Sequence, residues 1–224
     1  MGRPLIIAID GPSGAGKGTV ARELARRLNY KHLDTGAMYR AVAWKALNDR
    51  LPLEDEDAVA AVARQAALVM GPSSVVIDGH DVTSAIRTPE IDRAAAAAAR
   101  LPKVRAALVE RQRKEGERGG IVMEGRDIGT VVFPNADVKI YLDASPEERA
   151  RRRAADPSHG ISRAAAAADV AMEMAARDRS DRTRSMSPLT IPKDAIELDT
   201  TMLSIDETVD RVLAIVNDAI TAPR

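Results

Sequence analysis

The sequence predicts an α/β protein in which a five-stranded parallel sheet is covered by helices on both faces. Short apolar runs alternate with helical segments, and unbroken apolar runs are typical of strands that are buried on both sides. The expected strands are residues 5–9, 30–33, 120–123, 138–142 and 195–198. Strands that alternate with helices form parallel sheets, and ligands bind beyond the carboxyl ends of such strands.

The first expected strand leads directly into the loop Gly11-Pro-Ser-Gly-Ala-Gly-Lys-Gly-Thr19, and an expected helix over residues 20–28 follows. Glycines let successive backbone N–H groups curl around an anion, and the N-terminus of the helix adds partial positive charge. Lys17 can then reach the outer phosphates of a nucleoside triphosphate. Gly18 stands where Ser or Thr is usual, a form that resembles nucleoside monophosphate kinases more than motor ATPases or GTPases. The alternative is a glycine turn that only caps a helix.

A second polar string, Asp34-Thr-Gly-Ala-Met-Tyr-Arg40, follows the second expected strand and begins a helix. Thr35 is expected to cap this helix. Arg40 lies beside the helix N-terminus, and this combination predicts a second anion site. The alternative is an ordinary capped helix with Tyr39 packed in the core.

Residues 35–117 form an excursion between the second and third main strands that is too long for a plain crossover helix. Within it, Val75-Val-Ile-Asp-Gly-His-Asp-Val82 predicts a small hairpin that turns at Asp78-Gly79. We expect this insert to close over a substrate. The alanine runs at residues 94–99 and 164–168 favour helix and are expected to carry no chemistry.

The third string, Glu124-Gly-Arg-Asp-Ile-Gly-Thr130, comes directly after the third main strand. An acidic residue at this strand end is where phosphate-loop proteins steer Mg²⁺ through its water shell. No side chain is therefore expected to bind the metal directly, with Glu124 acting through water. Gly125 and Gly129 are expected to allow tight turns around Arg126 and Asp127. The alternative for these two charges is a surface salt bridge, which needs no glycines.

Capping signals mark two further helices. Ser145-Pro-Glu-Glu148 predicts that Ser145 caps one helix while Glu148 reaches back to the capping residue. Ser204-Ile-Asp-Glu207 predicts the same arrangement at the start of the final helix, which we expect to end at about residue 220.

Arginines gather on the first of these helices and on a later one. Arg149, Arg152 and Arg153 share one helix face just before the segment Ala154-Ala-Asp-Pro-Ser-His-Gly160, whose Pro and Gly predict the tip of a lid. Arg177, Asp181 and Arg184 share a face of the later helix. Arg binds phosphate bidentately and neutralises charge on a transferring phosphoryl group. The alternative is a solvated, salt-bridged helix surface, which we favour for Arg151 and Arg179.

Composition narrows the class of protein. The chain has 224 residues, a length that suits one compact domain with a small insert, and its 33 basic and 33 acidic residues give a formal net charge of zero. No global basic field favours nucleic acid or a membrane surface. The absence of cysteine excludes disulfides and thiolate metal sites. The sequence lacks a signal peptide and a membrane span, so we expect a cytoplasmic protein. No exposed apolar stripe stands out, so we expect a monomer.

Together these strings resemble the bacterial cytidylate kinases, and the resemblance runs nearly end to end. Its most specific part is Gly125-Arg-Asp-Ile-Gly-Thr-Val-Val-Phe-Pro134, and Asp81-Val-Thr-Ser-Ala-Ile-Arg87 and residues 177–189 add to it. The resemblance implies a three-layer P-loop NTPase fold in a single kinase domain. Its core would be residues 1–34, 118–150 and 164–221, the monophosphate-binding insert 35–117, and the lid 151–163.

The resemblance also implies a reaction, the Mg²⁺-dependent transfer of a phosphoryl group from ATP to CMP or dCMP. Residues implied in ATP binding are Gly11, Gly14, Ala15, Gly16, Lys17, Gly18, Thr19, Arg149 and Arg152. Those implied in CMP binding are Thr35, Tyr39, Arg40, Arg105, Arg126, Asp127, Arg177, Asp181 and Arg184. Those expected to act on the transferring group are Lys17, Arg126, Arg153, Arg177 and Arg184.

One position departs from the relatives. Ala96 stands where a Ser helps to hold the base, and the loss of one neutral hydrogen bond costs about 1 kcal/mol. The preference for cytosine over uracil is therefore less certain than the class of reaction. Two alternatives remain, a kinase for another small acceptor (AMP, UMP or shikimate) and a nucleotide-dependent switch without an acceptor.

Overall fold

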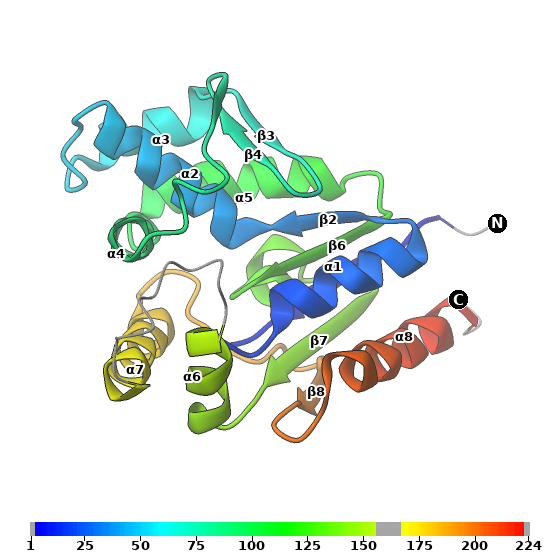
Figure 1. Ribbon diagram of the computed structural model, residues 1–224. Coiled ribbons are helices and arrows are strands. Elements are labelled where there is room, and N and C mark those ends of the chain that lie inside the picture. Colours follow the sequence, from blue (N-terminus) through cyan, green and yellow to red (C-terminus); the bar gives the residue numbers. More distant parts are fainter. Residues whose placement is uncertain (1–2, 156–166, 222–224) are drawn as a thin grey trace.

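The expected parallel sheet is the centre of the molecule. In the computed structural model, which describes residues 3–155 and 167–221, its strands lie in the order β2-β6-β1-β7-β8, and every neighbouring pair is parallel (Figure 1). The strands are β1 (Ile6–Asp10), β2 (Lys31–Asp34), β6 (Ile121–Gly125), β7 (Val138–Asp143) and β8 (Ile196–Asp199). The strand predictions are confirmed, with bounds that move by no more than a residue or two.

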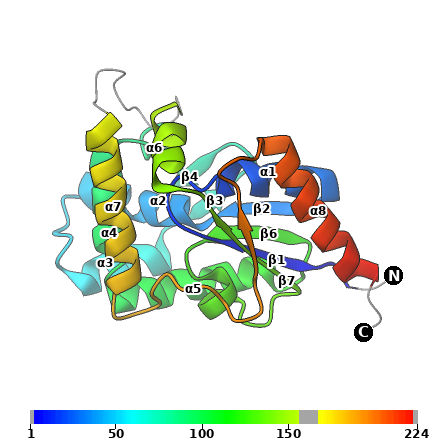
Figure 2. The same ribbon diagram turned by 90° about the horizontal axis from the view of Figure 1, so that it is seen from below.

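Helices cover both faces of this sheet, as the unbroken apolar strands require. Helices α1 (Lys17–Leu28) and α8 (Ile205–Thr221) pack on one face against residues such as Ile7, Ile9 and Leu142. Helices α2 (Thr35–Asn48) and α5 (Pro102–Gly116) pack on the other face against Ala8, Leu33 and Met123. Figure 2 shows α8 and α5 on opposite sides of the strands. The result is a three-layer α/β arrangement.

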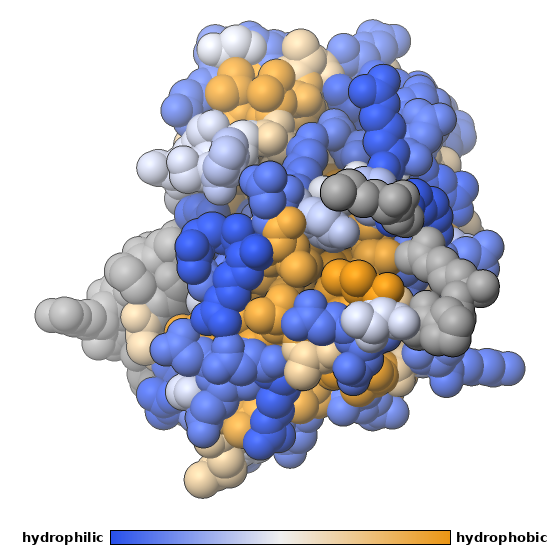
Figure 3. All heavy atoms as spheres, turned by 90° about the vertical axis from the view of Figure 1, so that its right-hand side faces the viewer, coloured by the Kyte–Doolittle hydropathy of each residue, from blue (hydrophilic) through white to orange (hydrophobic). Residues whose placement is uncertain are grey.

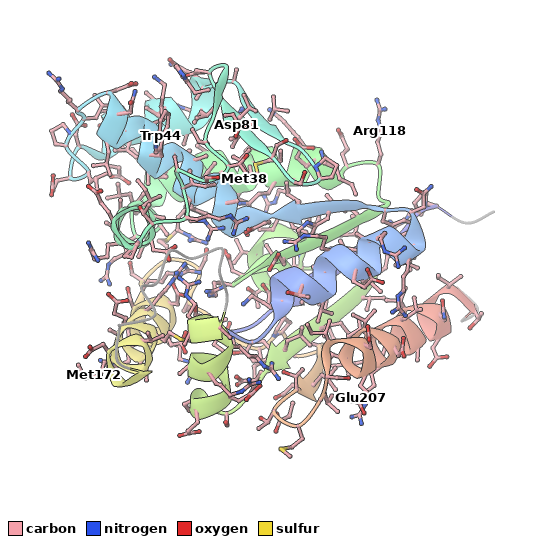
Figure 4. All side chains as sticks on the ribbon, in the orientation of Figure 1. Met38, Trp44, Asp81, Arg118, Met172 and Glu207 are labelled. Atoms are coloured by element: carbon pink, nitrogen blue, oxygen red, sulfur yellow. The ribbon has the colours of Figure 1, made fainter. Side chains whose placement is uncertain are left out.

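The long excursion contains the expected small sheet. Strands β3 (Leu68–Met70), β4 (Val75–Ile77) and β5 (His80–Asp81) pair antiparallel, and the hairpin turns at Asp78-Gly79 as predicted. Helices α3 (Glu56–Gln65) and α4 (Pro89–Ala98) complete this part of the chain. In Figure 4, Trp44 on α2 lies beside the small sheet, with its ring 6.0 Å from the ring of His80.

Two further helices stand beside the carboxyl ends of the strands. Helix α6 (Pro146–Ala155) packs on α7 (Ala167–Thr183) through Ala150, Val170 and Met174. Met172 points away from this contact, as Figure 4 shows, and is 68% exposed. The described residues include only the first part of the expected lid, 151–155. The rest of the lid, and residues 164–166 of the second alanine run, lie outside them.

Helix caps agree with the sequence at one site and differ at two. At the start of α8, Ser204 Oγ accepts the Glu207 N–H, and Glu207 accepts the Ser204 N–H in return. Ser145 Oγ likewise accepts the Glu148 N–H, but the Glu148 carboxylate binds Arg151 and Arg152 and does not reach back. The prediction for Glu148 was therefore wrong, because charged partners on the next turn outcompete one backbone N–H.

The cap of α2 is also different from the expected one. Asp34 is the capping residue, and its carboxylate accepts the Ala37 N–H at 2.9 Å. Thr35 is already helical and donates its hydroxyl hydrogen to the Glu124 carbonyl at 2.7 Å. The predicted role of Thr35 as the cap was wrong, and its side chain ties α2 to β6.

The segment after β6 is a short π-helix, η1 (Ile128–Val132), where the sequence predicts turns. Gly125 and Gly129 serve close packing, since neither has a positive φ. A Cβ on Gly125 would lie 2.7 Å from both Thr35 Oγ1 and Ile128 Cδ1, and a Cβ on Gly129 would lie 2.9 Å from Pro192. Any side chain at these positions would push the loop away from the sheet.

The surface seen from the right of Figure 1 is mostly hydrophilic, with smaller apolar patches between charged side chains (Figure 3). Among the described residues, no helix combines the length and the apolar character that crossing a membrane requires.

Candidate active site

A cavity of about 960 Å³ opens at the carboxyl ends of the strands. Its lining includes the glycine-rich loop, the start of α2, the loop between β3 and β4, α4, the loop after β6, the helices α6 and α7, and the segment that leads into α8. Parallel sheets bind ligands at this edge. The residues predicted for both nucleotides that line the cavity are Gly14, Ala15, Gly16, Lys17, Gly18, Thr19, Thr35, Tyr39, Arg40, Arg126, Asp127, Arg152, Arg153, Arg177, Asp181 and Arg184.

The glycine-rich loop has the left-handed backbone that its sequence predicts. Gly14 and Gly16 have φ values of +77° and +88°, which other residues rarely adopt. Gly11 lies beneath the loop and does not line the cavity. A Cβ there would be 2.0 Å from the Leu142 carbonyl oxygen, so Gly11 permits close packing on β7. Its predicted part in ATP binding is thus reduced to shaping the loop.

Lys17 begins α1 with its ammonium group inside the loop. Its Nζ donates to the Pro12 carbonyl at 2.6 Å, and the residue is 6% exposed. Burial, together with the nearby charge of Arg126, lowers the pKa of Lys17 from 10.5 to about 7. An anion inside the loop would favour the charged form of Lys17 and so reverse this shift.

Glu124 lies against the loop at Gly18. A Cβ on Gly18 would be 3.1 Å from Glu124 Oε1, and the same oxygen lies 3.1 Å from His32 Nε2. A side chain at position 18 would require the Glu124 carboxylate to shift by a few tenths of an ångström. Among the described residues, no group of three His, Cys, Asp or Glu side chains could hold a metal. The Glu124 carboxylate at Gly18 fits a metal that is held mainly by phosphates and water.

Two buried aspartates that the sequence reasoning missed hold the loops in place. Asp10, at the end of β1, accepts the N–H groups of Ile128 and Gly129 at 2.8 and 2.7 Å. Burial raises the pKa of Asp10 to about 6. The only available signal was its position at a strand end, which by itself does not reveal a partner 118 residues away.

Asp178 is the second of these aspartates, and it supports the glycine-rich loop from below. It accepts the Ser13 N–H at 3.2 Å and forms an ion pair with Arg149, which also donates to the Ser13 carbonyl at 3.1 Å. Arg149 is 8% exposed and does not line the cavity. These contacts favour a supporting role for Arg149 at Ser13, and its predicted contact with ATP stays a prediction.

Arg152 is the lid-side arginine that does face the glycine-rich loop. A Cβ on Gly16 would lie 3.7 Å from its Nη1, which donates to Thr200 Oγ1 at 2.8 Å. Arg151 is 69% exposed and pairs with Glu148, and Arg179 is exposed, as expected for surface arginines.

On the opposite side of the cavity, charges of alternating sign form a chain. Arg105 pairs with Asp127, and Arg184 lies 3.7 Å from both Asp127 and Asp181. Asp181 in turn accepts a hydrogen bond from Arg126 Nε at 2.9 Å. The sequence predicted each of these five residues for the acceptor nucleotide, and the fold brings them together from α5, the loop after β6 and the end of α7. Four of them line the cavity, whereas Arg105 is 3% exposed and is not among the lining residues.

Several donors in this region are buried without a hydrogen-bond acceptor. Within residues 3–155 and 167–221, such atoms include Tyr39 Oη, Arg40 Nε, Arg105 Nε and Arg184 Nη2. Burial raises the pKa of Tyr39 to about 12, so its hydroxyl stays a donor. Burial and the charge of Arg105 lower the pKa of Arg184. Unpaired buried donors are costly, and their clustering indicates a site for a polar, anionic ligand.

Arg40, Arg153 and Arg177 converge on a third missed residue, Asp92 of α4. Its carboxylate lies 2.5 Å from Arg153, 3.5 Å from Arg177 and 4.0 Å from Arg40. Arg40 also pairs with Asp34 at 2.9 Å. Asp92 lies next to the alanine run that was expected to carry no chemistry, and Ala95, Ala96 and Ala99 of that run line the cavity. The run therefore borders the cavity, and the expectation that it carries no chemistry stays a prediction.

The arrangement brings the glycine-rich loop and a cluster of arginines to one cavity. Comparison with known proteins shows the family to which the chain belongs. The family model for cytidylate kinase matches residues 7–218. Curated cytidylate kinases from Desulfitobacterium hafniense (strain Y51) and Solibacter usitatus (strain Ellin6076) are 50% and 48% identical to the chain. Each match spans 98% of the chain, and 96% and 95% of the respective relatives. The chain belongs to the cytidylate kinase family. The resemblance stated from the sequence is thereby confirmed.

Solved structures support the fold of this cytidylate kinase family member. A gluconokinase from Sinorhizobium meliloti 1021 matches 98% of the chain with a TM-score of 0.51 and 16% identity, over 96% of its own length. A shikimate kinase from Bacteroides thetaiotaomicron matches 95% of the chain with a TM-score of 0.50 and 12% identity, over 98% of its own length. At these identities the likeness concerns the fold alone. The predicted three-layer P-loop fold is confirmed.

Proposed function

We propose that the protein transfers the γ-phosphoryl group of ATP to CMP or dCMP, giving ADP and CDP or dCDP. One observation supports this most directly. Unsatisfied buried donors and clustered arginines face the glycine-rich loop across one cavity. A nucleotide switch needs only the loop, and the second cationic site would then have no purpose. Membership of the cytidylate kinase family favours CMP over AMP or shikimate as the acceptor.

The donor nucleotide lies on the side of the glycine-rich loop. Backbone N–H groups of residues 14–19 and the N-terminus of α1 hold its phosphates, with Lys17 at the outer ones. Lys17 moves from the Pro12 carbonyl to the phosphate oxygens, since these carry more charge than a carbonyl. Arg152 borders this site. Asp178 and Arg149 keep the loop in shape without touching the nucleotide.

The acceptor nucleotide lies on the side of Arg40, Arg126, Arg177 and Arg184. Its phosphate oxygen is the nucleophile and is largely ionised near neutral pH, because the second phosphate pKa is about 6. No general base is then required, and catalysis depends on positioning and on neutralising charge. Lys17 and Arg153 hold the transferring group, while Arg126, Arg177 and Arg184 anchor the acceptor phosphate. Tyr39, Thr35, Arg105, Asp127 and Asp181 shape the remainder of the acceptor site.

Magnesium is the expected metal for this reaction. When bound to ATP it neutralises charge between the phosphates that separate in the transfer. Glu124 is the carboxylate that would hold its water shell, since it lies directly against Gly18 of the loop. His32 fixes the orientation of that carboxylate at 3.1 Å.

The remaining assignments are proposals of the same kind. The insert 35–117 forms the acceptor side, and residues 151–163 form a lid that excludes water, which is a competing acceptor. We place the protein in the cytoplasm, as a monomer that acts on free nucleotides and does not bind nucleic acid.

An acceptor panel tests the function. ADP release is measured with ATP and Mg²⁺ in the presence of CMP, dCMP, UMP, AMP or shikimate, with Lys17→Ala as the inactive control. We expect CMP and dCMP to stimulate ADP release most strongly, and Lys17→Ala to abolish that stimulation. Stimulation by a different acceptor would reassign the substrate. ATP hydrolysis that no acceptor changes would instead favour a nucleotide switch.

A further inference from the structure

Asp92 occupies an unusual position among the charged residues near the cavity. It lies in the first half of α4, whose N-terminal cap is Thr88, and its side chain is 17% exposed. One carboxylate oxygen is 2.5 Å from Arg153 Nη2, and the other is 3.5 Å from Arg177 Nη1 and 4.0 Å from Arg40 Nη1. A single carboxylate of the insert thus contacts arginines of α6, α7 and α2.

The carboxylate and the three arginines have different relations to the cavity. Arg40, Arg153 and Arg177 line it, whereas Asp92 is not among the described residues of its wall. The carboxylate therefore contacts the guanidinium groups without occupying the space that they face.

The contact of Asp92 with the three arginines offsets the repulsion between their guanidinium groups. Three guanidinium groups that converge in a partly desolvated site repel one another and would otherwise turn apart toward water. The effect is visible at Arg177, where burial and the charge of Arg126 lower the pKa while Asp92 opposes the change. Asp34 pairs with Arg40 at 2.9 Å, and the charge of Asp181 acts on the pKa of Arg177 in the same direction as that of Asp92.

We propose that Asp92 is a positioning residue for the acceptor phosphate, holding Arg40, Arg153 and Arg177 in a convergent arrangement before the nucleotide arrives. This inference rests on the proposed function, which places Arg40 and Arg177 on the side of the acceptor phosphate and Arg153 at the transferring group. The helix that carries Asp92 belongs to the insert, while Arg153 and Arg177 belong to α6 and α7. The contact therefore also joins the acceptor side of the cavity to the helices that flank the lid.

The test compares Asp92→Asn with Glu90→Gln, which removes an exposed carboxylate from the first turn of the same helix. Initial rates give KM for CMP and for ATP, and the inhibition constant of cytidine probes the base pocket without a phosphate. Thermal melting monitors folding. A second variant, Asp92→Ser, removes the charge with a smaller side chain and allows a decision if Asp92→Asn does not fold.

We expect Asp92→Asn to raise KM for CMP about 10- to 100-fold, the usual loss when an outer partner of a ligand-holding side chain is removed. KM for ATP and the inhibition constant of cytidine should stay within about twofold, and Glu90→Gln should resemble the parent. Asp92→Glu keeps the charge and should recover most of the affinity for CMP.

Three results would overturn the inference. An unchanged KM for CMP would show that the arginines do not need this carboxylate. A lower KM would show that Asp92 competes with the phosphate. Equal losses for CMP, ATP and cytidine would show a general structural role. Failure of the parent protein to phosphorylate CMP would instead refute the proposed function, so the two failures are distinguishable.

Discussion

The support beneath the glycine-rich loop gives the most decisive test of the structural reasoning. Replacing Asp178 by Ala leaves the charge of Arg149 buried and removes the acceptor of the Ser13 N–H. Removal of one partner from a buried ion pair destabilises proteins by about 3–5 kcal/mol. Arg149 keeps the carbonyls of Ser13 and Ala144 and lies 3.7 Å from Asp143, so we expect the lower end, about 3 kcal/mol.

This loss should be visible in thermal melting. For a domain of this size, 1 kcal/mol corresponds to about 2–4 °C, so Asp178→Ala should lower Tm by roughly 6–12 °C. The matched control is Glu173→Ala on the same helix, where the carboxylate is 70% exposed and the expected change is within about 0.5 kcal/mol. KM for ATP should also rise in Asp178→Ala, because the loop loses a contact that fixes Ser13.

A double variant tests whether Arg149 serves mainly in the buried ion pair with Asp178 or contacts ATP directly. Apolar replacement of both partners, Asp178→Leu with Arg149→Met, leaves no unpaired charge and should recover most of the lost stability. A fall in Tm of less than 2 °C for Asp178→Ala, or a double variant less stable than the single one, would refute this account of Arg149.

Three further predictions concern the site itself. Lys17→Ala should melt within a few degrees of the parent, because burial already disfavours the charged lysine. The same variant should lower kcat at least about 100-fold in the ADP assay, and a near-normal kcat would exclude the assignment of the loop to ATP. With a pKa of about 7, Lys17 must take up a proton when it binds phosphate above that pH, so ATP affinity should fall up to about tenfold per pH unit between pH 7.5 and 9. Calorimetry in buffers of different ionisation enthalpy measures the proton, and pH-independent binding without uptake would contradict the prediction. Ala96→Ser should improve the ratio of kcat/KM for CMP over UMP about fivefold, the equivalent of one neutral hydrogen bond; an unchanged ratio would show that this position does not contact the base.

The fold was predictable because its signals are local. Unbroken apolar runs, a glycine-rich loop with Lys17, and the capping box at Ser204 each fall within a few residues. Errors occurred where several partners competed for one group. The Glu148 carboxylate binds two arginines and not the backbone N–H of the capping residue, and Asp34 is the cap of α2 where Thr35 was expected.

The site was predictable in its residue types but not in its pairing. The strings that contain Lys17, Arg40, Arg126 and Arg177 all meet at one cavity, as parallel strand ends require. The sequence placed Arg149 and Arg152 on one face of the helix. It gave no signal that Arg149 pairs with the buried Asp178 while Arg152 faces the glycine-rich loop. That distinction depends on how α6 packs against α7.

By itself the sequence determined the layered fold, the glycine-rich loop and the cationic character of two sites, because each follows from short-range pattern and backbone chemistry. Only the tertiary structure decided which carboxylate meets which arginine. Asp92 and Arg153 are 61 residues apart, Asp178 and Arg149 are 29 apart, and Asp10 reaches residues 118 and 119 positions away. The sequence spacing of such pairs follows no regular pattern. A buried charge needs a partner, and the packing of the other elements decides which oppositely charged residue lies within reach.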